Sequence, residues 1–293
     1  MTQVREHKRP IFRFAPSPNG RLHLGHALSA LLNLKMAREA GGVMLLRIED
    51  IDRVRCTPKL EAMMLADLEW IGFEWDEPPR RQSMHFAQYK AALDELQSRA
   101  LVYPAFLSRA QIKALAAADP HWPADPDGAP HYPGDERSLS IAKQAALMAG
   151  GADFALRIDM GKAIAAAGKP LSWNETGAGP GGETGMVAAN PQDWGDAILG
   201  RKDVPASYHL ACVLDDALQG VTHVVRGADL FHATSIHRLL QELLALPAPV
   251  YHHHRLILGP DGTKLSKSRS DTAIAHLRDA GVTPEEVRRM IGL

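Results

Sequence analysis

The chain has 293 residues, of which 45% are hydrophobic and 23% are charged. This length can form one large α/β domain or two small ones, so the fold class has to come from the sequence pattern. The formal net charge of −1 excludes a strongly positive field around the whole molecule. An RNA partner would therefore need local basic patches on the surface.

The composition gives no sign of a membrane segment or of a disulfide framework. Residues 1–10 are polar and charged, without the apolar region of a signal peptide, and no later apolar run reaches membrane-spanning length. Cys56 and Cys212 belong to no Cys-x-x-Cys pair, which favours two small buried side chains in a reducing compartment. We therefore expect a cytoplasmic protein that acts without a membrane, and we expect a monomer.

Strand and helix patterns alternate in the first part of the chain. Thr57 followed by Pro58 predicts a helix start, with Thr57 as the N-cap. The order strand, helix, strand, helix indicates a parallel sheet of the dinucleotide-binding kind, and so an α/β fold. The elements before Thr57 are predicted from apolar runs and turn residues as a strand over 11–15, a turn over 16–20, a helix over 23–40 and a strand over 43–48.

The pattern is interrupted between Tyr103 and Gln192, where Pro, Gly and Ala dominate, and we interpret this segment as an insertion that divides the sheet. After it we predict a helix over 208–218, a strand over 221–226, a helix over 235–246 and a strand over 251–254. The predicted parts are a first half of the core over 1–102, an inserted subdomain over 103–192, a second half of the core over 193–250 and a C-terminal part over 251–293.

A short helical segment is predicted to end the chain. The residues from Thr283 to Glu286 read Thr-Pro-Glu-Glu, which is a capping box that begins a helix. Val287, Met290 and Ile291 then fall on one face of that helix. We expect this face to pack back on the body of the protein.

The first of two motifs that carry chemistry is His23-Leu24-Gly25-His26, which follows a strand and a turn. Backbone N–H groups and the positive end of a helix can hold a phosphate at such a place. His23 and His26 can both donate to phosphate oxygens, and Gly25 lets a base or a ribose approach the backbone. The motif alone leaves open that the histidines only cap a helix, and zinc would need a third ligand that is not nearby.

The second motif is Lys264-Leu265-Ser266-Lys267-Ser268, in a loop that contains the turn signal Pro260-Asp261-Gly262. Its two lysines can reach a triphosphate when the loop closes, although alone the motif also fits a solvated basic loop. Together the two motifs indicate an enzyme that consumes ATP and forms an adenylate. The three histidines at 252–254 are interpreted as structural residues of a strand rather than as metal ligands.

Four separated blocks resemble class I glutamyl-tRNA synthetase, in order and over nearly the whole chain. His23 to His26 and Lys264 to Ser268 match the HIGH and KMSKS signatures of that family. The resemblance implies a Rossmann-type catalytic core that binds ATP between the two signatures, with His23, His26 and Lys267 as catalytic residues and Mg²⁺ as a cofactor. The blocks are residues 13–26, 46–52, 225–230 and 264–268.

The resemblance also implies the substrate sites, residue by residue. The chemistry agrees, because Glu49 can pair with an α-ammonium group and arginines can bind carboxylates, although an ordinary ion pair is the alternative for Glu49. The implied ATP site is His23, Gly25, His26, Lys264, Ser266 and Lys267. The implied L-glutamate site is Arg13, Phe14, Ala15, Pro16, Ser17, Glu49, Tyr208 and Arg226.

Full-length members of the family carry a helical anticodon-binding region after the second signature, whereas only residues 269–293 follow it here. In this respect the chain resembles a shorter, paralogous branch of the family. That resemblance implies that glutamate is activated with ATP without any tRNA. The glutamate would then pass to the queuosine base in the anticodon of tRNA(Asp), with no protein nucleophile. The alternatives are a minimal enzyme that charges a tRNA 3′ end and an inactive paralogue that binds ATP or tRNA.

Many members of that branch bind zinc through a Cys-x-Cys pair and a later Tyr-x-Gly-x-Cys segment. In this chain Ala105 and Leu107 stand at the first two cysteine positions, and Glu136 stands at the third. Two apolar side chains and one carboxylate cannot replace three thiolates. We therefore predict that the protein carries no structural zinc.

Overall fold

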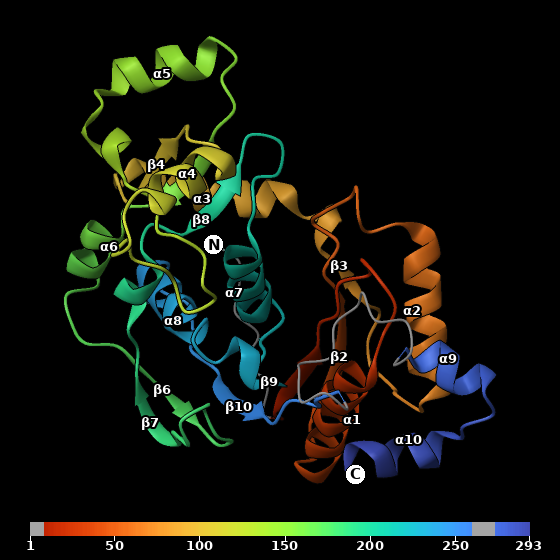
Figure 1. The fold of residues 1–293 in the computed structure, drawn as a ribbon. Helices are drawn as coiled ribbons and strands as arrows, with labels where there is room; N and C mark the ends of the chain where they lie inside the picture. Colours follow the sequence, from red (N-terminus) through yellow and green to blue (C-terminus); the bar gives the residue numbers. More distant parts are fainter. Residues whose placement is uncertain (1–8, 260–272) are drawn as a thin grey trace.

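A computed structural model describes residues 9–259 and 273–293. Figure 1 shows two groups of elements, with the main sheet and its helices on one side and a smaller sheet on the other. The main sheet has seven strands in the order β3-β2-β1-β9-β10-β6-β7. Its strands are β1 Ile11–Phe14, β2 Val43–Ile48, β3 Arg80–Arg81, β6 Ser172–Glu175, β7 Gly185–Ala188, β9 His223–Gly227 and β10 Val250–His254.

Six of these strands run parallel, and only β7 is antiparallel to its neighbour. The register places Phe12 of β1 opposite Met44 of β2 and His223 of β9. β1 is buried along its whole length, and β2 is buried except at its first residue, as expected for strands covered on both faces. The predicted α/β fold with a parallel sheet is confirmed.

Helices pack against the main sheet and around the small sheet, and two of the core helices begin as predicted. Thr57 caps α2 by accepting a hydrogen bond from the backbone N–H of Leu60, and α7 spans the predicted residues 208–218. The helices are α1 Leu24–Glu39, α2 Pro58–Trp70, α3 Phe86–Ser98, α4 Arg109–Ala117, α5 Ile141–Ala149, α6 Met160–Ala167, α7 Tyr208–Leu218, α8 Thr234–Leu243, α9 Ile274–Asp279 and α10 Pro284–Ile291. None of the described helices is both long and apolar enough to span a bilayer.

The final helix α10 packs beside α1, as Figure 1 shows, and the predicted capping box at Thr283 is present. Val287 and Ile291 are fully buried in the same apolar cluster as α1. The prediction for Met290 is wrong, because its side chain is 52% exposed. At 100° per residue Met290 lies one step away from Ile291 around the helix, and this step brings it to the solvent side.

A second, antiparallel sheet is formed by β4 Val102–Ala105, β5 Ala155–Ile158 and β8 Ile198–Arg201. Two of its strands come from the segment 103–192 or its edge, whereas β8 comes after that segment. Conversely, β6 and β7 lie inside the segment but extend the main sheet next to β10. The insertion is thus linked to the core by strand pairing in two places, because β8 joins the small sheet and β6 joins the main sheet. The predicted boundaries of the insertion at 102 and 192 stay predictions.

Candidate active site

A cavity of about 660 Å³ lies at the carboxyl ends of β1, β2, β9 and β10. The carboxyl edge of parallel strands is where open α/β sheets bind ligands. The turn after β1, the first turn of α1 and the first residue of α7 also contribute to the wall. Its lining includes Arg13, Phe14, Ala15, Pro16, Ser17, His23, Gly25, His26, Ser29, Glu49, Tyr208, Arg226, Asp229 and His254.

All predicted site residues that the structure describes therefore line one cavity. These are the eight residues of the implied glutamate site and the His23, Gly25 and His26 of the implied ATP site. Lys264, Ser266 and Lys267 lie outside the described residues. The roles of all these residues remain predictions.

The two histidines of the first motif cap α1 through their Nδ1 atoms. The backbone N–H of Gly25 donates to His23 Nδ1, and the backbone N–H of His23 donates to His26 Nδ1, each over 3.1 Å. Because each Nδ1 accepts a hydrogen bond, the proton of the neutral ring must be on Nε2. A Cβ atom at Gly25 would lie only 3.0 Å from the His23 ring. The cap and the donor role are therefore compatible, and capping fixes which nitrogen can donate.

Arg13 is held from behind by a buried carboxylate on α7. Its Nε atom donates to Asp216 Oδ1 over 3.0 Å, and its Nη2 atom donates to Oδ2 over 3.4 Å. Burial alone would raise the pKa of Asp216, but the charges of Arg13 and Arg47 outweigh burial and lower it. Asp216 is therefore ionised, and it fixes the plane of the Arg13 guanidinium at the cavity wall.

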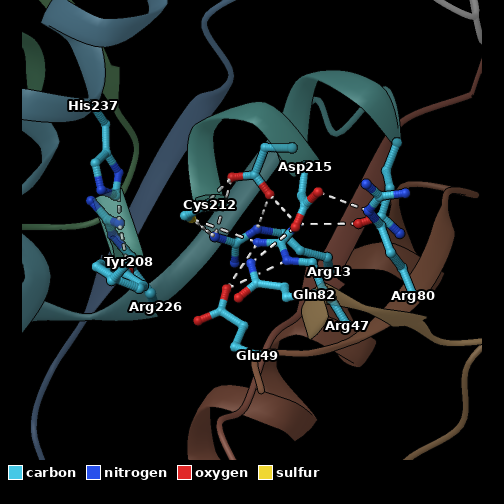
Figure 2. Close-up of polar contacts among 12 residues, drawn as sticks. Arg13, Arg47, Glu49, Arg80, Gln82, Tyr208, Cys212, Asp215, Arg226 and His237 are labelled. Carbon is cyan, nitrogen blue, oxygen red and sulfur yellow. Dashed lines mark hydrogen bonds and ion pairs between the residues drawn. The ribbon is translucent and has the colours of Figure 1, made fainter. Parts of the chain in front are cut away.

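Glu49 is held in a similar way by a fully buried arginine. Arg47 donates to Glu49 Oε1 through Nη2 over 3.2 Å, and it donates to Asp216 Oδ1 through Nη1 over 2.6 Å. Figure 2 shows these side chains converging beside α7. Burial raises the pKa of Glu49, although Arg47 acts against this change. The second oxygen of Glu49 is not engaged by Arg47, and an ammonium group in the cavity would favour the ionised form.

Arg226 stands at the end of β9, and its contacts differ from those of Arg13. Its guanidinium donates to Thr234 Oγ1 over 2.7 Å, to His253 Nε2 over 3.0 Å, to His237 Nδ1 over 3.2 Å and to the Tyr208 hydroxyl over 3.4 Å. Burial raises the pKa of Tyr208 far above its ordinary value, so this phenol stays neutral. Each of these four partners has an uncharged form that accepts a hydrogen bond.

Sequence reasoning missed the residues behind the wall. Arg47 and Asp216 were not proposed, although a charged side chain within the apolar run of β2 is a usable signal. Asp215, next to Asp216, is equally buried and binds Arg80 and Gln82, with Tyr89 as a further partner. These contacts join α7 to β3 and α3, and they fix the helix that carries both Tyr208 and Asp216.

A second cavity, of about 1160 Å³, adjoins the first, because Tyr208 lines both. It lies between the small sheet, the loop after β2 and the start of α7. Its lining carries more basic than acidic side chains, which makes it a local basic surface on a chain whose net charge is close to zero. The basic residues are Arg53, Arg55, Arg109, Lys113, Arg157 and Arg201, and the acidic ones are Asp52, Asp125 and Asp203.

The region aligned with the family's zinc site is held together without thiolates. The Tyr132 hydroxyl donates to Glu136 Oε1 over 2.5 Å, and the backbone N–H groups of Phe106 and Leu107 point to the same pair of side chains. Within residues 9–259 and 273–293, no cluster of three or more His, Cys, Asp or Glu side chains is suited to a metal ion. A phenol and one carboxylate do not fit a structural zinc site.

Comparison with known proteins agrees with the geometry. A family model described as tRNA synthetases class I (E and Q), catalytic domain, matches residues 11–293. A glutamyl-Q tRNA(Asp) synthetase from Rhodobacter capsulatus is 46% identical over 97% of this chain and 100% of that protein. The chain belongs to the class I tRNA synthetases, in the branch of the glutamyl-Q tRNA(Asp) synthetases. The predicted family and the enzyme class, a ligase, are confirmed.

Other relatives share the fold over a smaller part of their length. A glutamate–tRNA ligase from a Synechococcus strain is 36% identical over 96% of this chain, which spans 56% of that ligase. The crystal structure of glutamate-tRNA synthetase from Elizabethkingia anophelis superposes with a TM-score of 0.73 at 29% identity, and it covers 89% of this chain and 53% of that one. The class I catalytic fold is therefore shared by both groups.

Proposed function

We propose that this protein activates L-glutamate with ATP and then transfers the glutamate to the queuosine base of tRNA(Asp). The observation that carries this proposal is the convergence of three features on one cavity. They are a helix start with two imidazole donors, a pair of buried arginines and one carboxylate. The name of the 46% identical relative, which this chain covers completely, supports the same reaction.

The first step joins glutamate to AMP. An oxygen of the α-carboxylate attacks the α-phosphorus of ATP, the bond from that phosphorus to the bridging oxygen breaks, and pyrophosphate leaves. Charge builds on the leaving group, and the Nε2–H groups of His23 and His26 would donate to it, together with Lys267. Mg²⁺ usually enters such sites on the phosphates of ATP, with one or two carboxylates, and the described part of the cavity offers Asp229.

Recognition of glutamate follows from the charges of the wall. Arg13 and Arg226 would bind the carboxylates, and the oxygen of Glu49 that Arg47 leaves available would bind the ammonium group. Glutamine has an amide in place of one carboxylate. An arginine would then face a neutral group, so we expect strong discrimination against glutamine.

In the second step a hydroxyl of queuosine attacks the activated carbonyl. The carbon–oxygen bond to the phosphate breaks, AMP leaves, and the hydroxyl proton passes to the departing phosphate or to water. The basic second cavity supports a nucleic-acid acceptor, because it meets the glutamate cavity at Tyr208. Single-stranded loops expose bases that proteins can bind. Both ATP and tRNA are cytoplasmic, so we propose that compartment.

The first step is tested by ATP–pyrophosphate exchange on the purified protein, with labelled pyrophosphate and no tRNA. We expect exchange that depends on L-glutamate and is at least about a hundredfold weaker with L-glutamine, in line with a lost charged contact. A protein that binds glutamate but never exchanges pyrophosphate would contradict the proposed activation. Exchange that requires tRNA would instead favour a conventional charging enzyme.

A further inference from the structure

Arg226 is enclosed by buried acceptors rather than by carboxylates. Its side chain contacts Thr234, His237 and His253, which are 0%, 1% and 2% exposed, and Arg226 itself is 5% exposed. Among the described residues, no carboxylate touches its guanidinium. Arg13, in the same cavity, is paired directly with Asp216. Unlike that of Arg13, the positive charge of Arg226 is therefore not balanced by direct contact with a carboxylate of the described residues.

Behind His253 lies a carboxylate from the strand that extends the main sheet. Glu175 of β6 is 1% exposed, and its Oε2 atom lies 2.5 Å from His253 Nδ1. Its Oε1 atom accepts from the backbone N–H groups of His253 and Gly177, each over 2.8 Å, and the Trp173 indole also faces the carboxylate. Burial opposes ionisation, but the bonds from His253 and Gly177 outweigh it and lower the pKa of Glu175 to about 2.

These contacts fix the tautomer of His253. An ionised Glu175 can only accept, so His253 Nδ1 must carry the proton. Its Nε2 atom then has a lone pair, which accepts from Nε of Arg226 over 3.0 Å. Burial lowers the pKa of His253 to about 4 and outweighs the hydrogen bond to Glu175, which raises it, and Arg226 lowers it further, so the ring stays neutral at ordinary pH. Glu175, His253 and Arg226 thus form a hydrogen-bonded series of carboxylate, imidazole and guanidinium.

A second neutral ring holds the other side of the guanidinium. His237 Nδ1 accepts from Nη1 of Arg226, and the His237 Nε2 atom lies 3.2 Å from His209 Nδ1. Burial lowers the pKa of His237, and the charge of Arg226 lowers it further. Burial likewise lowers the pKa of His209 to about 4. Two imidazoles and the Thr234 hydroxyl therefore receive the guanidinium without neutralising it.

We propose that Glu175 and His253 are positioning residues, which hold Arg226 in one orientation and keep its charge available for a carboxylate of the substrate. This inference rests on the proposed function, because the substrate carboxylate is that of glutamate. The ring of His253 separates the carboxylate of Glu175 from Arg226. Glu175 therefore helps to orient Arg226 without occupying the guanidinium N–H groups that a substrate carboxylate would use. The segment 172–175 thereby becomes part of the specificity apparatus, although it does not line the cavity.

The test compares Glu175→Gln and His253→Leu with wild type in glutamate-dependent exchange. In Glu175→Gln the tautomer of His253 is no longer fixed, because an amide can either accept from or donate to Nδ1. His253→Leu removes the acceptor. We expect the KM for glutamate to rise at least about tenfold in both, with the KM for ATP and kcat within about threefold, since a hydrogen bond to a charged group is lost.

Two further variants separate positioning from simple structural damage. His253→Gln retains an oxygen that can accept from Arg226 and an amide that can donate to Glu175, so we expect it to restore a KM for glutamate near that of wild type. His252→Gln is the matched control on the same strand, where the ring contacts Thr176 instead. Equal rises of the KM for glutamate and for ATP, or a KM for glutamate that does not change in Glu175→Gln, would overturn the positioning role.

Calorimetric titration with glutamate, in the absence of ATP, keeps this inference separate from the proposed function. We expect the Kd for glutamate to rise at least about tenfold in Glu175→Gln and to stay within about twofold in His252→Gln. A wild-type protein that binds glutamate without exchanging pyrophosphate would reject the activation step alone. Unchanged glutamate affinity in folded Glu175→Gln would reject the positioning role alone.

Discussion

Arg13 and Asp216 form a two-point ion pair between β1 and α7, with Nε 3.0 Å from Oδ1 and Nη2 3.4 Å from Oδ2. Both side chains are almost completely buried. The same carboxylate also receives Arg47, which in turn holds Glu49. One aspartate thus fixes a carboxylate-binding group and, through Arg47, an ammonium-binding group of the cavity.

We predict that Asp216→Asn lowers the free energy of unfolding by about 3 to 5 kcal/mol, because it leaves two buried arginines short of a counter-charge. Urea unfolding at neutral pH measures this loss. Asp94→Asn, which breaks the exposed pair with Lys90, is the control and should change stability by less than about 1 kcal/mol. Similar losses in the two variants would show that the buried network adds no special stability.

Stability should fall as the solution becomes mildly acidic. Burial and the charge of Arg226 lower the pKa of His209 and of His253 to about 4. Between about pH 6.5 and 4 the unfolded chain therefore binds protons that the folded chain does not, so stability rises with pH across this window. We expect a loss of up to about 1.4 kcal/mol per pH unit for each histidine as the pH falls.

This slope is measured by urea unfolding at several pH values from 7.5 to 4.5. His209→Gln should reduce the slope by about one proton, because one of the titrating rings is gone. A protein whose unfolding free energy is constant from pH 7.5 to 4.5 would contradict the neutral state assigned to these rings.

His26→Asn separates capping from catalysis. An asparagine can still accept from the backbone N–H of His23, but it lacks the Nε2–H that we assign to the leaving group. We expect kcat for exchange to fall by about a hundredfold to a thousandfold, while the unfolding free energy changes by less than about 1 kcal/mol. A variant that loses stability and keeps its kcat would show that His26 only caps α1.

The thiolate-free contact of Tyr132 and Glu136 predicts how the protein behaves toward chelators. We expect metal analysis of the purified protein to find far less than one zinc per chain, and EDTA to leave the unfolding midpoint unchanged. Tyr132→Phe should cost about 1 to 3 kcal/mol, because the half-buried Glu136 and the N–H of Leu107 lose a partner. One tightly bound zinc per chain would contradict this account.

The sequence predicted the cavity wall better than what lies behind it. Residues 11–26 and 43–49 carry strand, turn and helix signals that follow one another directly, so local patterns place Arg13 and Glu49 near strand ends and His23 at a helix start. The partners of those residues come from distant segments, since Asp216 is 203 positions from Arg13. A single sequence does not indicate which buried charges pair over such separations.

The role of residues 172–188 was also beyond local patterns. Glycines surround β6 and β7 and hide their strand signal, so the segment was assigned to the insertion alone. Its pairing with β10 brings Glu175 next to His253, a contact across 78 positions. The sequence pattern at 252–254 indicates structural histidines, and the structure adds the contact of His253 with Arg226.

The most direct test of the central claim is transfer of labelled glutamate to purified tRNA(Asp), compared between tRNA that contains queuosine and tRNA that lacks it. The account predicts stable labelling of the queuosine-containing tRNA only. It also predicts no labelling of tRNA that was oxidised with periodate beforehand, because periodate cleaves the diol of queuosine as well as the 3′ diol. Equal labelling of both tRNAs through the 3′ end would contradict it.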